Sequence, residues 1–268
     1  MPSILYDHRF YPADALLIGG ASRGLRYGDG LFETMKVREG VLLLAPLHFA
    51  RLWKGFEVLR FTVPYTPASL EAEVLDLCVR NGHTGLGRVR LNIFRGGGGV
   101  NEPLSMAPHC LIESFSLVVA SDVPTGLDID VFPDGRKAQD AFSNLKTNNY
   151  LLYLMGAAWA RERGLGECLV LNAHGRVADA SISNVFWVSS GQVCTPPLSE
   201  GGVAGVTRRF LLENLSIEER PLEVSDLLAA DEVFLTNAIT EIRWVRRFGE
   251  KTYGHAVSDQ IAHKLFIH

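Results

Sequence analysis

Apolar positions near the start of the chain predict a group of β-strands. Short apolar clusters within residues 1–20 indicate strands, and residues 31–37 and 41–44 have the composition of two more. Residues 38–40 lie between these last two runs and end in glycine, which favours a turn, so the runs are expected to pair as a hairpin.

Helices and then two longer strands are predicted for the rest of the N-terminal part. Apolar side chains recur at helical spacing in two sets, first Leu52, Phe56 and Leu59 and then Leu70, Val74 and Leu77. Residues 88–94 and 110–120 have the composition of strands. The glycine run at 96–99 between them is expected to be a loop.

Residues 121–126 are the best candidate for a domain linker. Pro124 and Gly126 lie in this segment, between two strand-like runs, and both residue types interrupt regular structure.

The C-terminal half is predicted to mix helices and strands. The expected elements are a helix from Leu151 to about Gly164, strands at 167–171 and 184–188, a helix that opens at Gly205, and a helix with Val257, Ile261 and Leu265. Strands and helices do not alternate regularly, so the predicted fold class is α+β (mixed α/β) rather than doubly wound. We expect a smaller N-terminal domain at 1–120 and a larger C-terminal domain at 127–268 that carries Lys146.

Composition and charge narrow the function. A formal net charge of −4 gives no basic surface for nucleic acid or an anionic membrane. The longest apolar stretch, residues 151–160, is shorter than the roughly 20 residues that span a membrane, and the N-terminus lacks signal-peptide features. The four cysteines stand far apart, which predicts buried or half-buried free thiols. We expect a soluble cytoplasmic protein.

Common nucleotide and metal motifs do not occur in the sequence. The glycines at 96–99 lead into Val100-Asn101 rather than the Lys-Ser/Thr of a P-loop, and the glycines within 24–30 lack dinucleotide-binding spacing. The eight histidines show no metal-ligand spacing, so no metal site is expected.

Lys146 is unusual among the six lysines, because the polar stretch 143–150 around it leads directly into an apolar helix. Lysines at such boundaries are ordinarily solvated. The alternative is an amine whose pKa is lowered, so that it can attack an aldehyde.

Several other positions suit an anionic ligand. The glycine-rich segment 201–208 runs into a helix, where backbone N–H groups and the Thr207 hydroxyl can bind an anion. Arg51 lies one turn after His48 on the predicted helix that contains Leu52 and Phe56, and Thr236 follows the apolar run 233–235. Asp179 precedes a predicted buried strand, where it can cap a turn or pair with a cationic ring nitrogen. A flexible loop, a solvated arginine and a satisfied turn are the simpler alternatives for the first three positions.

Six segments, in this order, resemble the class IV aminotransferase family of fold type IV pyridoxal 5′-phosphate (PLP) enzymes over nearly the whole chain. The family includes branched-chain and D-amino-acid aminotransferases and aminodeoxychorismate lyases. The segments are 23–34, 48–52, 145–149, 179–186, 195–197 leading to 205–208, and 236–237.

The resemblance implies a role for each matched residue. Lys146 looks like the lysine that forms the Schiff base with PLP and shuttles the proton. The implied phosphate cup consists of Arg51, Val206, Thr207 and Thr236. Asp179 takes the position that faces the pyridine nitrogen, where the family usually has the longer Glu. The implied substrate region includes Phe32, Glu33 and Arg95.

The resemblance also implies a two-domain enzyme with its active site between the domains, and a homodimer. We expect a PLP-dependent amino-acid transaminase that removes the substrate α-proton and acts on amino acids and keto acids. The first alternative is an aminodeoxychorismate lyase, which forms 4-aminobenzoate and pyruvate. The lyases often carry a second arginine after the glycine loop, and none follows Gly96–Gly99 here. A more distant alternative is a catalytically silent PLP-binding protein.

Overall fold

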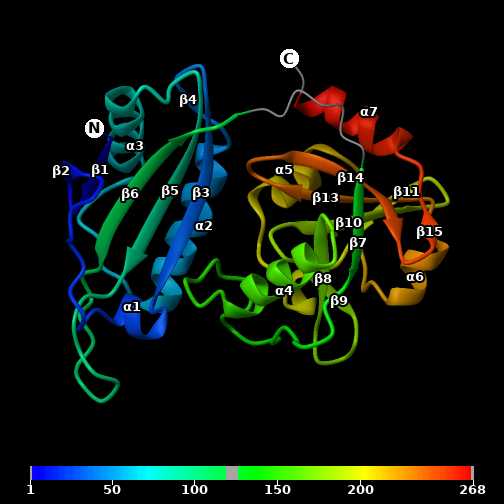
Figure 1. Cartoon of the computed structure of the whole chain (residues 1–268), viewed down its shortest axis with the longest axis horizontal. Coiled ribbons are helices and arrows are strands. Elements are labelled where there is room, and N and C mark those ends of the chain that lie inside the picture. Colours follow the sequence, from blue (N-terminus) through cyan, green and yellow to red (C-terminus); the bar gives the residue numbers. More distant parts are fainter. Residues whose placement is uncertain (1, 119–125, 267–268) are drawn as a thin grey trace. The chain divides into compact units, whose positions relative to one another are not determined.

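The chain divides into two structural units, each with its own hydrophobic core (Figure 1). The structure is a computed structural model that describes residues 2–118 and 126–266. The first unit comprises residues 2–118 and Leu145–Tyr150, and the second comprises residues 126–144 and 151–266. The predicted linker lies outside the described residues apart from Gly126. In the described ranges, no helix has both the length and the apolar composition needed to cross a membrane.

An antiparallel sheet forms the centre of the first unit, with the strand order β2-β1-β6-β5-β3-β4 among the described residues. Its strands are β1 (Ser3–Tyr6), β2 (Arg9–Pro12), β3 (Gly30–Arg38), β4 (Val41–Leu42), β5 (Leu86–Phe94) and β6 (His109–Ser116). The hairpin predicted around residues 38–40 is confirmed as β3 and β4, and the predicted strand at 110–120 ends at Ser116.

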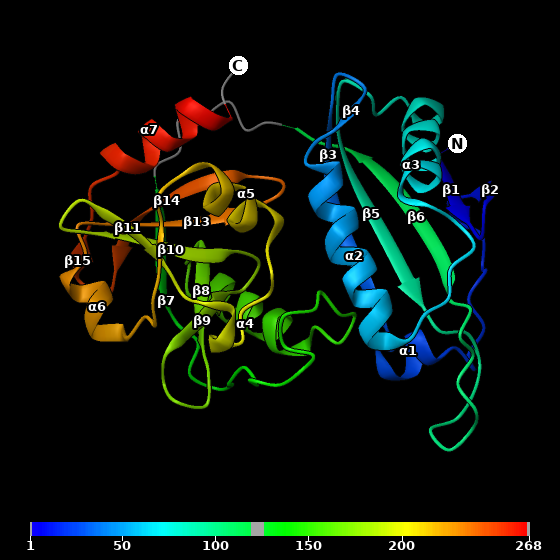
Figure 2. The ribbon, with the colours of Figure 1, turned by 180° about the vertical axis from the view of Figure 1, so that it is seen from behind.

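Helices α2 (Ala45–Leu59) and α3 (Pro67–Asn81) cover one face of this sheet, and Figure 2 shows both running alongside it. A capping box between Thr66 and Ser69 starts α3, because each side chain satisfies a backbone N–H that the helix leaves unpaired. Alternate residues of β3 point toward these helices, so Phe32 on β3 lies on the opposite face. The short helix α1 (Arg23–Tyr27) precedes β3.

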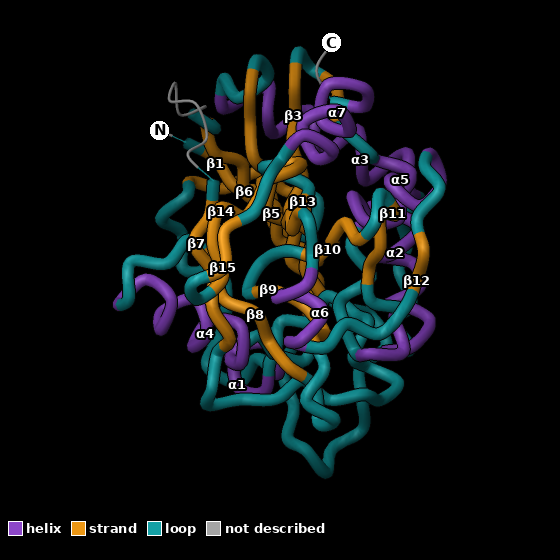
Figure 3. The backbone as a smooth tube through the Cα atoms, turned by 90° about the vertical axis from the view of Figure 1, so that its right-hand side faces the viewer, coloured by secondary structure: helices purple, strands orange, loops and turns teal. Residues whose placement is uncertain are grey.

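A larger mixed sheet forms the second unit, with the order β12-β11-β10-β13-β14-β7-β8-β9 and β15 paired to β14 within the described residues. Its strands are β7 (Leu127–Val131), β8 (Glu167–Leu171), β9 (Val177–Ala180), β10 (Asn184–Ser189), β11 (Gln192–Thr195), β12 (Glu218–Glu219), β13 (Glu232–Asn237), β14 (Glu241–Phe248) and β15 (Lys251–Thr252). Figure 3 shows these short strands in orange among teal loops. Strands from both ends of the sheet share one core, so the sheet curves around it.

Four helices pack against the second sheet. They are α4 (Leu151–Glu162), α5 (Val206–Asn214), α6 (Val224–Ala229) and α7 (Ala256–Leu265), with a 3₁₀ turn at Leu198–Glu200. Helices α5 and α7 share a core cluster with Phe186 and Phe234 of β10 and β13, whose rings stack with centroids 5.1 Å apart. Helix α4 packs on β8 through Ala160 and Cys168. As expected, all four cysteines of the chain are free and buried.

The segment Leu145–Tyr150 belongs to the first unit, although the sequence placed Lys146 in the C-terminal domain. The reason is main-chain pairing with β3. The Phe32 N–H donates to the Lys146 carbonyl and the Asn148 N–H donates to the Gly30 carbonyl, both at 2.9 Å. Leu145 also joins the first core.

Gly30→Ala is expected to lower the free energy of unfolding by about 1–3 kcal/mol, the usual cost of overpacking. A Cβ at this position would lie 2.3 Å from the Ile93 carbonyl oxygen and 2.7 Å from Asn148 Nδ2. Urea unfolding of full-length protein measures the effect, with Gly19→Ala as the control because no atom lies within 4 Å of a Cβ there. Equal stability of Gly30→Ala and wild type would contradict the close approach of residues 145–150 to β3.

Candidate active site

Lys146 lies in an aromatic setting built by the first unit. Its Nζ is 4.4 Å from the ring centre of Phe32 and 5.5 Å from that of Tyr150. The two rings meet edge to face, with centroids 5.3 Å apart. A small hollow adjoins this cluster and is lined by Leu31, Phe32, Glu33, Arg51, Leu52, Gly55, Leu145 and Lys146. The first unit therefore brings together four of the predicted site residues.

A buried charge cluster fixes the arginine of this hollow. Glu33 accepts hydrogen bonds from Arg51 Nε at 2.8 Å, from Arg51 Nη2 at 2.5 Å and from His48 Nδ1 at 2.7 Å. Burial alone would raise the pKa of Glu33, but the charge of Arg51 and these hydrogen bonds outweigh it and lower the pKa to about 2. Burial lowers the pKa of His48, so a neutral ring donates to the carboxylate. Glu33 thus holds the guanidinium plane of Arg51 in one orientation.

Arg90 joins the cluster of Lys146 and Phe32, and the sequence analysis did not single it out. Its guanidinium carbon lies 3.6 Å from the ring centre of Phe32, and its Nε donates to Asn92 at 3.2 Å. Lys146 and Arg90 therefore contact the same aromatic ring. The signal was present in the alternation of β5, where Arg88, Arg90 and Asn92 interleave with buried apolar residues and so share the face of Phe32.

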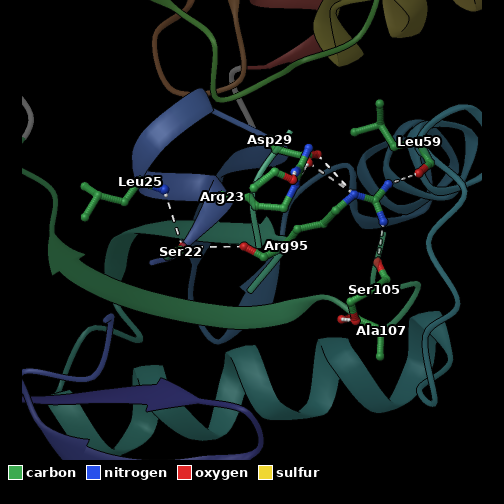
Figure 4. Close-up of polar contacts among 9 residues, drawn as sticks. Ser22, Arg23, Leu25, Asp29, Leu59, Arg95, Ser105 and Ala107 are labelled. Carbon is green, nitrogen blue, oxygen red and sulfur yellow. Dashed lines mark hydrogen bonds and ion pairs between the residues drawn. The ribbon is translucent and has the colours of Figure 1, made fainter. Parts of the chain in front are cut away.

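Arg95 has a different role from the predicted one, as Figure 4 shows. Its side chain is only 3% exposed. Its Nε donates to Asp29 at 3.3 Å, and its two terminal nitrogens donate to the carbonyl oxygens of Ser105 and Leu59. The guanidinium also lies over the ring of Phe61. Arg95 therefore joins the end of α2 to the loop after β5, instead of presenting its donors to a substrate.

Asp179 is the centre of a hydrogen-bond network in the second unit. Its carboxylate accepts from the Val203 N–H at 2.7 Å, from Asn184 Nδ2 at 2.8 Å and from the Tyr153 hydroxyl at 3.2 Å. Burial raises the pKa of Asp179 to about 7, and these donors together with Lys137 only partly offset it. This carboxylate can therefore exchange a proton near neutral pH.

The uncapped start of α5 lies close to that network. Gly205 precedes the helix without a capping side chain, and the first N–H groups of a helix have no partner within it. A Cβ at Gly205 would lie 1.7 Å from Asn184 Oδ1, so glycine is needed for this approach. Asn184 pairs in register with Thr236 on β13, which packs against α5.

Two buried hydroxyls at this place lack partners among the described residues. They are Thr207 Oγ1 on α5 and Thr236 Oγ1 on β13, both on residues 1% exposed. A buried polar group without a partner is costly, so its presence indicates a ligand that supplies acceptors. The second unit thus gathers the predicted residues Asp179, Val206, Thr207 and Thr236.

Known proteins resemble the chain in sequence and in structure. The family model described as Amino-transferase class IV matches residues 30–248. An aminodeoxychorismate lyase of Bacillus subtilis (strain 168) is 29% identical over 266 residues, covering 94% of this chain and 88% of the lyase. A 4-amino-4-deoxychorismate lyase from Pseudomonas aeruginosa has a TM-score of 0.85 at 30% identity, covering 99% of this chain and 100% of the other.

A branched-chain amino acid aminotransferase from Escherichia coli shares the fold, with a TM-score of 0.89 at 24% identity, covering 99% of this chain and 93% of the other. These likenesses confirm the predicted mixed α/β, fold type IV architecture. The family match covers most of the chain and includes all the predicted site residues. The chain belongs to the class IV aminotransferase family of enzymes.

Proposed function

We propose that this enzyme transfers the amino group of an amino acid with PLP as its cofactor. The observation that carries the proposal is the pair of buried, unpartnered hydroxyls of Thr207 and Thr236 at the uncapped start of α5. These donors suit a phosphate group, which helix N-termini bind readily. The backbone N–H groups of Val206 and Thr207 would complete the donors of the second unit, and Arg51 stays the arginine that the family resemblance assigns to the phosphate.

Two further residues fit the rest of the cofactor. The amine of Lys146 would form the covalent attachment, and Asp179 would face the ring nitrogen and keep a proton there. When bound, PLP supplies a conjugated ring that accepts electrons from the substrate α-carbon. Lys146 would then act as the base that removes the substrate α-proton and later returns it.

Arg90 is the residue we assign to the substrate α-carboxylate, in place of Arg95. A carboxylate that leaves water needs a charged partner, and Arg90 contacts the same ring as Lys146. Glu33 lies on the other face of β3 and binds Arg51, so it orients that arginine rather than the substrate. The ring of Phe32, which both side chains contact, contributes to the substrate surface.

A homodimer is part of the proposal. Leu151, Leu154 and Met155 are 65%, 60% and 53% exposed on one face of α4, at the i, i+3 and i+4 spacing that forms an apolar stripe. A second copy of the chain is the partner we assign to this stripe. A cytoplasmic location stays a prediction from the sequence.

Aminodeoxychorismate lyase is the second candidate, favoured by the identity of 29–30% to the Bacillus and Pseudomonas lyases over almost the whole chain. Both reactions need the same cofactor site and the same α-proton removal. They differ in what leaves the substrate, because the lyase expels pyruvate and forms 4-aminobenzoate without a keto-acid partner.

Turnover distinguishes these functions. As a transaminase, the PLP-loaded enzyme should convert one equivalent of amino acid per site to keto acid and then stop until 2-oxoglutarate or pyruvate is added. Quantification of the keto acid by chromatography, over a panel of L- and D-amino acids, measures this. Many turnovers of aminodeoxychorismate without an added keto acid would replace transamination with the lyase reaction. A protein that binds PLP but turns over neither substrate would be the silent binder.

Lys146→Ala should abolish covalent attachment of PLP, because no other lysine shares the Phe32 and Tyr150 cluster. Borohydride reduction of the loaded wild-type enzyme followed by peptide mapping should place the pyridoxyl group on Lys146. Lys137→Met is the matched control and should still be labelled. A label on Lys137 in the wild-type enzyme would contradict the assignment of Lys146 as the lysine that binds PLP.

Arg90→Gln should raise the KM for the amino acid at least tenfold while PLP stays bound. A charge-assisted hydrogen bond contributes about 1.5–3 kcal/mol, and about 1.4 kcal/mol corresponds to a factor of ten. Arg88→Gln serves as the control, since Arg88 lies two residues away on the same face but contacts Phe115 instead. If both variants keep the wild-type KM, another group binds the carboxylate.

A further inference from the structure

Lys137 is a half-buried lysine that the proposed function does not use. It lies in the loop between β7 and α4, where its N–H donates to the Leu171 carbonyl at 2.8 Å and fixes the backbone. Its ammonium lies 5.2 Å from the ring centre of Tyr153 on α4. The hydroxyl of that same tyrosine donates to Asp179. Lys137, Tyr153 and Asp179 therefore form one cluster inside the second unit.

Among the described residues, the groups that donate hydrogen bonds to Asp179 are neutral. The donors are the Val203 N–H from the glycine-rich loop, the Asn184 amide from β10 and the Tyr153 hydroxyl from α4. Lys137 is the cation that acts on this fully buried carboxylate and favours its ionised form. Asp179 in turn favours the protonated form of Lys137, as does Asp140, while burial lowers the pKa of Lys137.

The glycine-rich loop packs against the segments that carry Lys137 and Asp179. Gly201 has a φ of +93°, and a Cβ there would lie 2.4 Å from the Ala138 carbonyl oxygen and 3.4 Å from Lys137 Cγ. A Cβ at Gly202 would lie 3.5 Å from Asp179 Cγ. Side chains at these two positions would occupy the space around Lys137 and Asp179, so the two glycines let the loop pack close to both.

We propose that Lys137 is a positioning residue that keeps Asp179 ionised, so that the carboxylate is ready to pair with the protonated ring nitrogen of PLP. The proposal rests on the proposed function in one respect, namely that Asp179 faces the ring nitrogen. Lys137 acts through charge and need not touch the cofactor. Without Lys137, the carboxyl group of Asp179 would stay protonated up to a higher pH. A protonated carboxyl group would offer the ring nitrogen no negative charge.

Titration of the Asp179 carboxyl in the cofactor-free, full-length protein tests the inference directly. Aspartate labelled with ¹³C at the carboxyl carbon reports ionisation by NMR, and the Asp179 signal is the one missing from Asp179→Asn. Burial raises the pKa of Asp179, and the positive charge of Lys137 lowers it. Lys137→Met removes that charge and should therefore raise the pKa of Asp179 by about one pH unit. Lys137→Arg keeps the charge and should restore a pKa close to that of the wild type.

Lys251→Met is the matched control, because Lys251 also lies over a buried tyrosine ring, at 5.8 Å from Tyr253. The Tyr253 hydroxyl donates to the Leu227 carbonyl rather than to a carboxylate, so this variant should leave the pKa of Asp179 unchanged. If Lys137→Met does not fold, Lys137→Gln carries the same expectation. An unchanged or lowered pKa of Asp179 in the charge-free variant would overturn the proposal.

Binding of PLP to Asp179→Asn, measured by equilibrium absorption, tests the underlying function separately. Weaker binding than in the wild type supports a position of Asp179 at the ring nitrogen. Equal binding would remove Asp179 from the cofactor site, whereas the NMR titration would still decide whether Lys137 controls its ionisation.

Discussion

The pairing of residues 145–150 with β3 is the constraint on which the first half of the site depends. Two main-chain hydrogen bonds fix Lys146 beside Phe32, and the register of β3 with β5 then sets which side chains share its face. Phe32 and Glu33 lie on opposite faces of β3, and a slip of one residue in that register would exchange their faces.

Two buried carboxylates show how partners decide the charge of a group at similar burial. Glu33 and Asp179 are 1% and 2% exposed. Glu33 receives hydrogen bonds from a cationic guanidinium and has a pKa of about 2, so it stays ionised. Asp179 receives them from neutral groups and has a pKa of about 7. The first therefore serves as a fixed anchor, and the second is suited to sharing a proton.

Much of the first unit was predictable, because long apolar alternations and helical repeats dominate local structure there. Strands β3 and β5 and helices α2 and α3 all match predicted elements. Several strands of the second unit have only two to four residues, which is too short for a periodic signal, so β9, β12 and β15 were not predicted. Membership of Lys146 in the first unit depends on long-range backbone pairing, which composition does not record.

The candidate site was partly predictable for the same reason. The glycine-rich segment 201–205 before α5 and the position of Lys146 just before an apolar helix are local sequence signals. The family resemblance assigned a role to each of them. The internal contacts of Arg95 were not predictable, because they depend on carbonyl groups of distant segments. The face that Arg90 shares with Phe32, in contrast, follows from the alternation along β5. Lys137 likewise gains its neighbours only when β8 and α4 pack together.

The burial of all four thiols has a practical consequence. Cys78, Cys110, Cys168 and Cys194 are at most 1% exposed, and burial raises the pKa of each thiol. Thiolates are the reactive species, so alkylating dyes will react slowly with the native chain. One cysteine could therefore be introduced on the surface of each unit and labelled with a donor or an acceptor fluorophore. The four native cysteines would not have to be replaced first. Energy transfer between the dyes would then follow the distance between the two units as ligands are added.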